Sequence, residues 1–500
     1  MKNYLFVFFA AVFLSSFTSL SFAMDSPIFC LGSCVDVKVN DDSAGSCQHW
    51  TRFNGQQIAV RGDTVYLVWT DNRNGNFDIW FSRSTDRGAT WGQNVRVDHP
   101  PANDTAKQWY PAIAVDYRGY IYVIWTDGRP NNTYTNIFFS KSTNGGQSFS
   151  SDVKVSDSNY SLAGGDFQRA SIAIDNEHHY VFVVWVSKEG SSLYLRCSRS
   201  LDDGVSFDSS HYASWGLTNK ANPYIVFDQK NLILYTFYAS TGTGSVYSYI
   251  YCTKSTDSGY SFQLPVLVGE DPSGSTKSSP TADIDTCGNL YVAWRDYRNL
   301  KWEIFFSKSI DSGDSFLFAN ININIDNPTP GITGHIDPTL RTFGCEKICV
   351  LWTSTSNSSD STDIWADMSV NGGISWGTDF RMNNYTLNNQ YLPTAAINQE
   401  GDLFLAWTED RKRWNYPDIY SKWFHFDSVY VSKIGDANSD CKVSVSDCVY
   451  LINYLFKGGP PPCLLKLGDP NGDCKVSVSD VVYLINYLFK GGPPPLPWCA

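Results

Sequence analysis

One short turn sequence recurs along the chain and constrains the fold more than any other feature. Its pattern is Ser–x–Asp/Asn–x–Gly–x–x–aromatic. Ser and Asp side chains bond to nearby backbone groups, Gly allows a positive φ, and the aromatic residue packs under the turn. Because Asn replaces Asp in two copies, the motif predicts a structural turn and not acid–base chemistry. The six copies start 54 to 60 residues apart, at Ser84, Ser142, Ser200, Ser255, Ser309 and Ser369.

Strand-like runs precede these turns, and each run follows a shorter apolar strand such as Pro111–Val115. A further strand, such as Val153–Val155, follows each turn. Four short strands per unit predict an all-β fold of the β-propeller type. We predict seven blades, with six as the alternative because the fourth unit is the most degenerate. The seven runs end at Trp69, Trp125, Trp185, Phe237, Trp294, Trp352 and Trp407.

The last unit has neither the turn motif nor a fourth strand. At the other end of the chain, Val35–Asp41 (VDVKVND) matches the fourth-strand pattern of Val153–Asp157 (VKVSD). We therefore expect this N-terminal strand to complete the last blade. Such a strand would close the ring and cover its edges.

Composition and the N-terminus indicate the compartment. Aromatic residues form 15% and charged residues 18% of the 500 positions, as in a large β protein. The net charge of −12 disfavours nucleic acid or an anionic membrane as a partner. Lys2, the apolar run Tyr4–Phe13 and Ser21–Ala23 predict a secretory signal peptide at residues 1–23. We expect no transmembrane segment, because no later run reaches about 18 apolar residues. Export makes disulfides possible for the 13 cysteines.

The six turns resemble the Asp-box (BNR) repeats of sialidases and related propellers. The resemblance covers Val35–Asp427 and implies a sialidase-like propeller domain at residues 24–427. Sialidases of this kind open the first blade with Arg–Ile–Pro. Here Gly55 stands near the position of that arginine, and Arg52 is out of register. The resemblance therefore favours a propeller without sialidase activity.

Four units carry an acidic residue and an arginine, two positions apart, after the second strand. In sialidase-like propellers this loop lies on the ligand-binding face, so the resemblance makes these side chains candidates for glycan contacts. The alternative is that each arginine pairs with a nearby carboxylate and fixes its loop, and recurrence in four units favours this interpretation. The pairs are Asp71/Arg73, Asp127/Arg129, Asp296/Arg298 and Glu409/Arg411.

Aromatic residues between the blades are further candidates for sugar stacking, because they do not follow the repeat. Packing between blades is the alternative for each of them. They are Trp50, Trp109, Tyr110 and Tyr391.

The C-terminal segment is duplicated, and the copies Lys442–Pro462 and Lys475–Pro495 differ only at Cys448 and Val481. Each copy begins with Asp–x–Asn–x–Asp–x–x–x–Ser–x–x–Asp, an EF-hand-like loop whose oxygen atoms suit Ca²⁺. A short helix should follow each loop, at Val449–Phe456 and Val482–Phe489. The expected ligands are Asp436, Asn438, Asp440, the Lys442 carbonyl, Ser444 and Asp447, and then Asp469, Asn471, Asp473, the Lys475 carbonyl, Ser477 and Asp480.

Two loop–helix units with a terminal Asp resemble a type I dockerin, at residues 435–500 after a linker at 428–434. The resemblance implies a small α-helical domain that folds around two Ca²⁺ ions and docks onto a cohesin of another protein. It also implies partner contacts at Val445/Ser446, at Val478/Ser479 and along the following helices. The alternative is a calcium-stabilised cap without a partner.

Cysteine positions suggest disulfides. Cys441 and Cys474 in the loops should pair with Cys463 and Cys499 after the prolines. Cys345 and Cys349 flank an expected hairpin turn and form another candidate pair. Cys197 and Cys252 occupy equivalent strand positions and should be buried thiols.

These features favour a secreted, non-catalytic propeller that recognises a glycan or glycoprotein. A calcium-dependent dockerin would attach it to a cohesin-bearing partner, in polysaccharide breakdown or surface attachment. One alternative is an active exo-glycosidase of a polysaccharide-degrading assembly. Another is a structural component of an extracellular matrix or cell surface.

Overall fold

The structure is a computed structural model. It describes residues 30–31, 35–43, 48–51, 56–101, 105–129, 135–157, 161–162, 169–216, 218–241, 246–269, 274–324, 332–356, 362–385, 387–411, 416–425, 434–438, 443–459, 462 and 465–496. The predicted signal peptide and residues 428–433 of the predicted linker lie outside these ranges.

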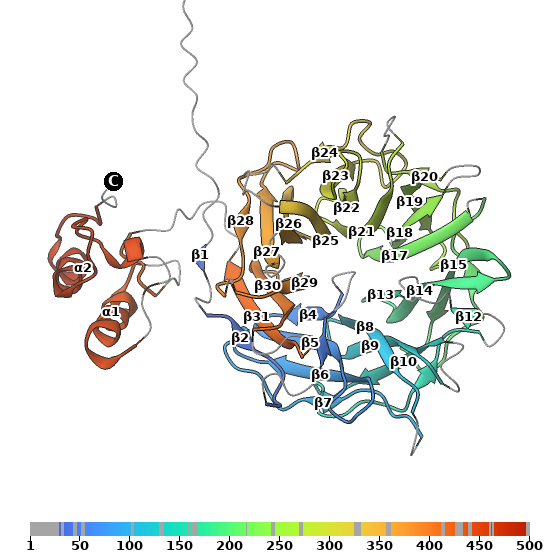
Figure 1. Cartoon of the computed structure of the whole chain (residues 1–500), viewed down its shortest axis with the longest axis horizontal. Coiled ribbons are helices and arrows are strands. Elements are labelled where there is room, and N and C mark those ends of the chain that lie inside the picture. Colours follow the sequence, from blue (N-terminus) through green and yellow to red (C-terminus); the bar gives the residue numbers. More distant parts are fainter. Residues whose placement is uncertain are drawn as a thin grey trace, which may run out of the picture.

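Seven antiparallel sheets surround a central channel, so the prediction of seven blades is confirmed and the six-bladed alternative is wrong (Figure 1). Blade 1 contains β3 (His49–Trp50), β4 (Ile58–Arg61), β5 (Thr64–Asp71), β6 (Asp78–Ser84) and β7 (Val95–Arg96). Blade 2 contains β8 (Gln108–Val115), β9 (Ile121–Asp127), β10 (Asn136–Ser142) and β11 (Val153–Lys154). Blade 3 contains β12 (Ser161–Leu162), β13 (Ala170–Asp175), β14 (Tyr180–Glu189), β15 (Ser192–Ser200) and β16 (His211–Tyr212).

The remaining blades follow in chain order around the ring. Blade 4 contains β17 (Thr218–Asp228), β18 (Ile233–Thr241), β19 (Ser248–Ser255) and β20 (Val266–Leu267), and blade 5 contains β21 (Lys277–Ile284), β22 (Leu290–Asp296), β23 (Glu303–Ser309) and β24 (Ile321–Asn322). Blade 6 contains β25 (Ile332–Phe343), β26 (Lys347–Ser356), β27 (Thr362–Ser369) and β28 (Phe380–Arg381). Blade 7 contains β29 (Gln390–Ile397), β30 (Asp402–Glu409) and β31 (Asp418–His425) with β1 (Cys30–Leu31) and β2 (Val37–Lys38).

The second strand of each blade is almost completely buried, because neighbouring blades cover both of its faces. Strand β9, for example, is buried at every position. In blade 4 the structure corrects the sequence alignment, since Tyr238, and not Phe237, occupies the position of the strand tryptophans. Strands buried on both faces read as apolar runs without alternation, so periodicity did not fix this register. The equivalent tryptophans Trp69, Trp125, Trp294, Trp352 and Trp407 are fully buried.

The recurring turns have the hydrogen bonds that their sequence predicts. Ser84 Oγ donates to Asp86 Oδ1 at 2.6 Å and accepts from the Gly88 amide at 2.8 Å. The sequence did not show that these turns also press against the preceding blade. A Cβ atom on Gly146 would lie 2.1 Å from the ring of Phe81. Glycine is therefore needed both for the positive φ and for the contact between blades.

The N-terminal strand completes the last blade, as predicted. In β2, Val37 pairs with Ser421 and Lys38 pairs with Tyr420 of β31. Without β2, the third strand β31 would present unpaired backbone groups at the edge of its sheet. The closure therefore joins the two ends of the propeller by backbone hydrogen bonds.

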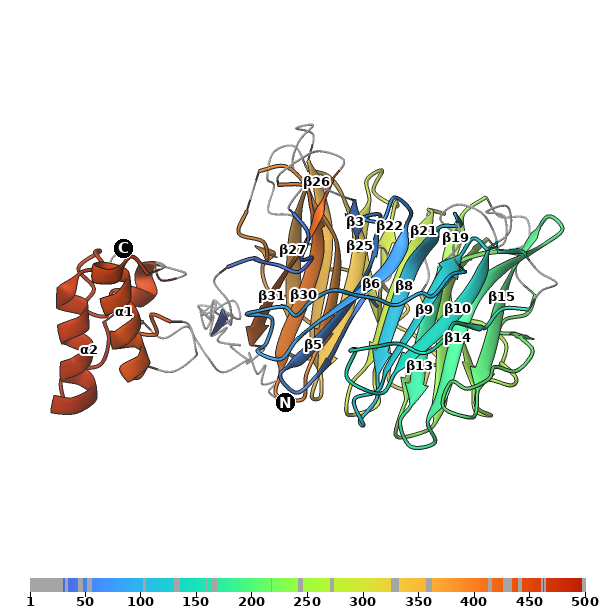
Figure 2. The same ribbon diagram turned by 90° about the horizontal axis from the view of Figure 1, so that it is seen from below.

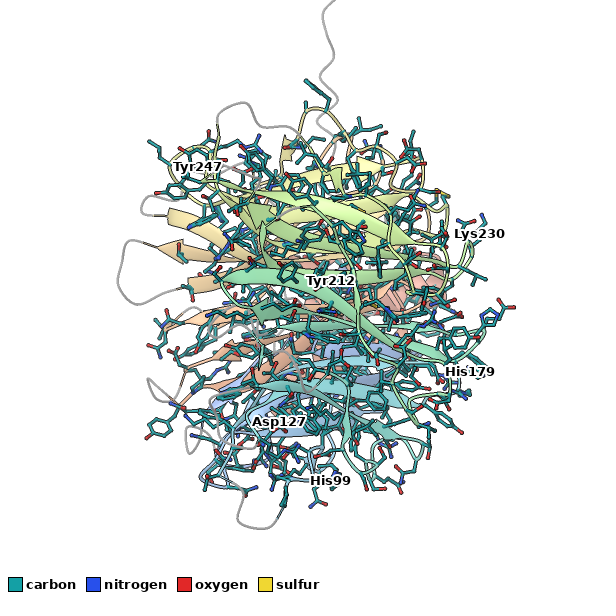
Figure 3. All side chains as sticks on the ribbon, turned by 90° about the vertical axis from the view of Figure 1, so that its right-hand side faces the viewer. His99, Asp127, His179, Tyr212, Lys230 and Tyr247 are labelled. Atoms are coloured by element: carbon teal, nitrogen blue, oxygen red, sulfur yellow. A yellow bond between two sulfur atoms is a disulfide. The ribbon has the colours of Figure 1, made fainter. Side chains whose placement is uncertain are left out.

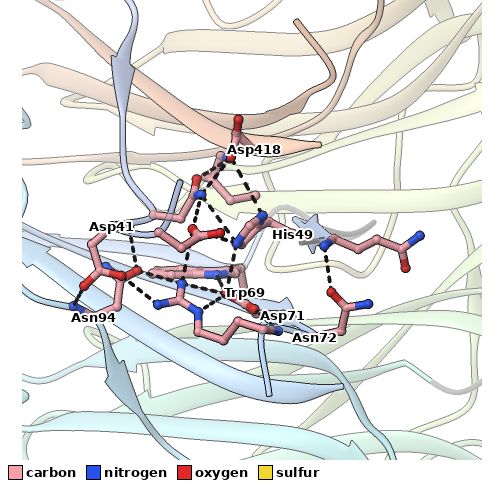
Figure 4. Close-up of polar contacts among 12 residues, drawn as sticks. Asp41, His49, Trp69, Asp71, Asn72, Asn94 and Asp418 are labelled. Carbon is pink, nitrogen blue, oxygen red and sulfur yellow. Dashed lines mark hydrogen bonds and ion pairs between the residues drawn. The ribbon is translucent and has the colours of Figure 1, made fainter. Parts of the chain in front are cut away.

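A cluster of charged side chains centred on the buried His49 reinforces this closure (Figure 4). His49 Nε2 lies 3.1 Å from carboxylate oxygens of both Asp42 and Asp71, and its Nδ1 lies 3.9 Å from Asp418. Burial alone would lower the pKa of His49, but its bonds to Asp42 and Asp71 outweigh burial and raise the pKa to about 9. Arg73 Nη1 reaches Asp41 at 2.6 Å. The cluster thus connects blade 7, the N-terminal segment and blade 1.

One disulfide of the propeller joins neighbouring blades. Cys287 follows β21, Cys345 follows β25, and their sulfur atoms are bonded. The predicted Cys345–Cys349 pair is therefore wrong, since Cys349 lies on β26 as a buried thiol. A strand residue directed into the core cannot reach the turn beside it. Cys197 and Cys252 are buried thiols, as expected.

Two helices follow the propeller, α1 (Val445–Lys457) and α2 (Val478–Lys490), and they pack against each other around Leu451 and Leu484 (Figure 2). Each begins four residues earlier than predicted. Ser444 and Ser477 cap the helices in capping boxes with the acidic residues three positions on, so the loop's last acidic residue already lies in the first helical turn. Within the described residues, neither helix is long and apolar enough to cross a membrane.

We predict that His49→Gln weakens the closure most below pH 6.5. Glutamine occupies the equivalent position in β8 and β29, so it should fit, but it carries no charge. The raised pKa means that His49 contributes stability fully below pH 6.5 and loses it as the pH rises through about 9. The variant should unfold with a free energy lower by on the order of 2 kcal/mol at pH 6. The deficit should shrink at pH 10, and calorimetry at both values measures it. An equal deficit at both pH values would contradict a role for the charge.

Candidate functional site

The propeller has two chemically different faces. The start of each inner strand lies beside the end of the second strand, as the pairing of Gln108 with Asp127 shows. The loops after the second strands therefore share one face, which we call the loop face, and the Ser–x–Asp/Asn–x–Gly turns lie on the other, the turn face. In Figure 3, Asp127 and Tyr247 lie toward the loop face, and His179 and Lys230 lie toward the turn face.

The acidic residue and arginine of each loop are bound to one another. In blade 2, Asp127 Oδ2 accepts hydrogen bonds from Trp125 Nε1 at 3.0 Å and from Arg129 Nε at 2.9 Å. Arg129 also reaches Asp152 at 2.9 Å, and its guanidinium lies 4.4 Å from the centre of the Phe138 ring. One carboxylate thus connects a buried tryptophan to an arginine that covers the next strand.

The same module recurs in the other three blades with this motif. The carboxylates of Asp71, Asp296 and Glu409 are buried and accept from the indoles of Trp69, Trp294 and Trp407. The pKa of Glu409 is raised by burial, which Arg411 partly offsets. Arg73, Arg298 and Arg411 lie 4.1, 3.8 and 3.8 Å from the rings of Trp80, Phe305 and Tyr420. These contacts are those of a loop support.

Blades 3, 4 and 6 depart from this module. Ser187, Ser240 and Ser354 stand at the position that carries the carboxylate elsewhere. In blade 4, Lys220 lies near the start of the inner strand, opposite Ser240. Lys220 is 1% exposed, and burial lowers its pKa to about 8. In blade 6, His335 Nδ1 lies 2.9 Å from Ser354 Oγ. The loop face is therefore not sevenfold symmetric. The blades that lack the carboxylate become apparent only when their strands are superposed by their pairing in the structure.

Backbone bulges occupy the inner strands near the loop face. The predicted ligand residue Tyr110 has a φ of +52° and precedes Pro111 where the β8–β9 register shifts. Its neighbour Trp109 is half-buried, as is Tyr391 in blade 7. The Trp50 side chain and Arg52–Gly55 lie outside the described residues. Bulges of this kind re-aim side chains and are common next to binding sites. The equivalent residues are Asn222, Ser279, Asp337 and Leu392.

A polar cavity of about 220 Å³ lies within the central channel between the inner strands. Arg341 Nη1 donates to the Tyr224 hydroxyl at 3.0 Å, which links blades 6 and 4. Burial raises the pKa of Asp283, and Arg341 partly offsets this effect. Gln56 Oε1 accepts from Ser171 Oγ at 2.8 Å. These residues are paired across the channel and cross-link its wall.

The second loop of the duplicated segment brings three predicted ligands together. Oxygen atoms of Asp469, Asp473 and Asp480 lie within 4.8 Å of one another. Asp480 Oδ1 is buried without a hydrogen-bond partner, and burial, with the charges of Asp469 and Asp473, raises its pKa to about 6. A cation placed among these oxygens would satisfy this atom and relieve the repulsion. The residues present therefore fit Ca²⁺.

The first loop is described only in part. Asp436 and Asp447 are buried, and Asp447 accepts from the amides of Asn438 at 3.1 Å and Ser444 at 2.8 Å. Asp440 and Lys442 lie outside the described residues. The carboxylate of the twelfth loop position is thus held by the helix cap, as in the second loop.

Cys474 takes the loop position at which glycine is usual. It has a φ of +67° and is disulfide-bonded. Its predicted partner Cys499 lies outside the described residues, as do Cys441 and Cys463. Both predicted pairings therefore remain predictions. A covalent bond at Cys474 would help to hold a backbone conformation that non-glycine residues avoid.

Fold and duplicated loops together define a seven-bladed β-propeller followed by a paired loop–helix unit. Residues 434–489 match the family described as Dockerin type I domain. A search among curated proteins gave no match for the chain.

The chain is similar to several solved structures. A polysaccharide lyase of family PL25, an ulvan lyase, is 11% identical with a TM-score of 0.52, covering 77% of this chain and 95% of that chain. A Hadza microbial sialidase is 12% identical (TM-score 0.45, 71% and 73%), and an α-L-arabinofuranosidase from Fusarium graminearum is 15% identical (TM-score 0.46, 66% and 96%). At 11% identity the likeness to the lyase shows the fold alone.

If the loop arginines are supports, Arg129→Ala should lower the free energy of unfolding by about 1–3 kcal/mol, because it leaves Asp127 buried with one partner fewer. Arg129→Lys should recover only part of this loss, since a lysine cannot make both contacts of the planar guanidinium. Thermal unfolding measures both effects. Lys230→Ala, at an exposed position on the turn face, should change nothing. Full stability of Arg129→Ala would overturn the support role.

Calcium binding to the second loop should weaken as the pH falls through 6, because Asp480 then takes up a proton that competes with the ion. Calorimetric titration with Ca²⁺ should show a loss of about tenfold between pH 7 and pH 5. Asp480→Asn should weaken this site at pH 7. The exposed Asp314→Asn serves as control and should leave both sites unchanged. Unaltered calcium affinity in Asp480→Asn would show that the carboxylate is not a ligand.

Proposed function

We propose that this protein is a secreted, non-catalytic propeller that recognises a glycan, and that its C-terminal unit attaches it to a cohesin-bearing partner in a calcium-dependent manner. The observation that carries the attachment is the match of residues 434–489 to the dockerin type I family. The clustered carboxylates of Asp469, Asp473 and Asp480 support the calcium dependence.

The duplicated helices present the same apolar side chains twice, which supports docking through either copy. Val445 and Val478 are 51% and 50% exposed, and Phe456 and Phe489 are both 65% exposed. Apolar side chains kept in water on a small unit of two helices suit a protein interface. A partner could therefore bind the unit in two orientations.

The non-catalytic part of the proposal is supported by how the arginines of the loop face are paired. Arg129, Arg298 and Arg411 contact carboxylates of their own blades. Arg73 contacts Asp71 of its own blade and Asp41 of the N-terminal segment. Each arginine is thus paired locally instead of converging with the others on one point. A glycoside hydrolase needs two carboxyl groups placed about a single bond, whereas a binding surface needs only shape and suitable contacts. Location outside the cell follows from the proposed signal peptide and the proposed cohesin partner.

Cohesin docking should tolerate the loss of one helix face but not of both. Val445→Asp and Val478→Asp should each leave binding to an immobilised panel of cohesin modules within about threefold. The double variant should lose binding, as should the wild type with excess chelator. Surface plasmon resonance measures these responses. A single variant that abolishes binding would exclude two equivalent orientations, and binding that ignores chelator would exclude calcium dependence.

The propeller function is tested by incubating the full chain with a panel of soluble polysaccharides. Affinity electrophoresis should show retardation by at least one of them. Assays for new reducing ends and for unsaturated sugars should show no product. Product formation would overturn the non-catalytic assignment. New reducing ends alone would favour the exo-glycosidase alternative, whereas unsaturated sugars would indicate a polysaccharide lyase.

A further inference from the structure

In blades 3 and 4 an aromatic residue stands where the other blades carry a polar one, and it contacts a lysine of the next blade. At the start of the third strand, five blades carry a polar residue of the Asp, Asn or Glu type, and blades 3 and 4 carry Tyr194 and Tyr249. Lys220 of the next blade lies 5.6 Å from the Tyr194 ring, and Lys277 lies 4.7 Å from the Tyr249 ring. The five polar residues are Asp78, Asn136, Glu303, Asp363 and Asp418.

In blade 3 this tyrosine begins a cluster of three rings that reaches the surface. The ring centres of Tyr194 and Tyr212 lie 5.5 Å apart, and those of Tyr212 and Trp215 lie 5.3 Å apart. Arg196 lies 3.8 Å from the Tyr212 ring, and the Tyr212 hydroxyl donates to Glu189 at 2.9 Å. The inner rings are therefore fixed in orientation before any ligand arrives.

The outer end of the cluster is exposed. Trp215 is 54% exposed, and on the neighbouring blade Tyr247, two residues before Tyr249, is 42% exposed. Both belong to the loop face, where Figure 3 shows Tyr247 near the edge. A tryptophan left in water on a rigid aromatic support suggests a contact with a ligand and not with the core.

We infer that Trp215 and Tyr247 form the glycan-binding platform of the propeller and that they stack on an uncharged polysaccharide whose pyranose rings carry equatorial substituents. This inference rests on the proposed glycan recognition. A pyranose whose substituents are equatorial presents flat faces of C–H groups, and these faces suit the electron-rich faces of aromatic rings.

Charge favours a neutral ligand over an acidic one. The chain has a net charge of −12, which repels a polyanion at low ionic strength. Lys220 and Lys277 are each 1% exposed, so they support the rings from within instead of meeting a ligand. Arg196 is committed to Glu189 at 2.6 Å. Recognition at this platform therefore depends on stacking.

The test measures binding of the full chain to cellohexaose, xylohexaose and mannohexaose by calorimetry, with oligogalacturonate as the charged comparison. The wild type should bind at least one neutral oligosaccharide. Trp215→Ala should weaken that binding at least tenfold, and Tyr247→Ala should weaken it by a smaller factor. Trp215→Phe should retain most of it. Tyr117→Ala removes a ring of similar exposure, 58%, from the turn face and should have no effect.

The outcomes distinguish a failure of the Trp215 platform from a failure of the proposed glycan recognition. Binding of a neutral oligosaccharide that survives Trp215→Ala, with thermal unfolding unchanged, would overturn the platform and leave glycan recognition intact. Binding of oligogalacturonate alone would overturn the assignment of a neutral ligand. No binding to any carbohydrate would overturn the proposed function itself. Equal losses in Trp215→Ala and Tyr117→Ala would also contradict the platform.

Discussion

The architecture depends on a closure that joins the first strand of the propeller to the last. Backbone pairing between β2 and β31 aligns the N-terminal strand with the last blade. The charged cluster around His49 adds ion pairs to Asp71 of blade 1 and Asp418 of blade 7 across the junction. Burial would raise the pKa of Asp71, but its bonds with His49 and Arg73 outweigh burial and lower it. Without this junction, backbone groups at the edge of the last sheet would be unpaired. The positions of the loops, and hence of any binding surface, follow from it.

The repeated parts of the fold could be predicted because the residues of each turn determine its conformation by themselves. Ser84, Asp86 and Gly88 specify a local set of hydrogen bonds. The six turns gave the spacing of the units, and the seven strand runs gave the number of blades. Contacts between blades are not local, and the sequence did not reveal them. The approach of Gly146 to Phe81 joins residues that lie far apart in the chain, and so does the Cys287–Cys345 bond.

The same distinction explains what was found and missed at the loop face. The pairing of Asp127 with Arg129 spans two residues and was foreseen as a support. The pairing of Tyr194 with Lys220 crosses from one blade to the next, and no repeat marks it, because it is defined by a departure from the repeat. In the calcium loops the ligand spacing was visible, whereas the orphaned oxygen of Asp480 became apparent only in three dimensions.

The position of β31 has a mechanical consequence. The strand is hydrogen-bonded to β30 on one side and to β1 and β2 on the other, and the chain leaves it toward the helical unit. If one end of the protein were anchored and the other held a polymer, tension would enter through this strand. To pull β31 out, such a force must break two ladders at once, so the ring would resist the load at the point where it is joined.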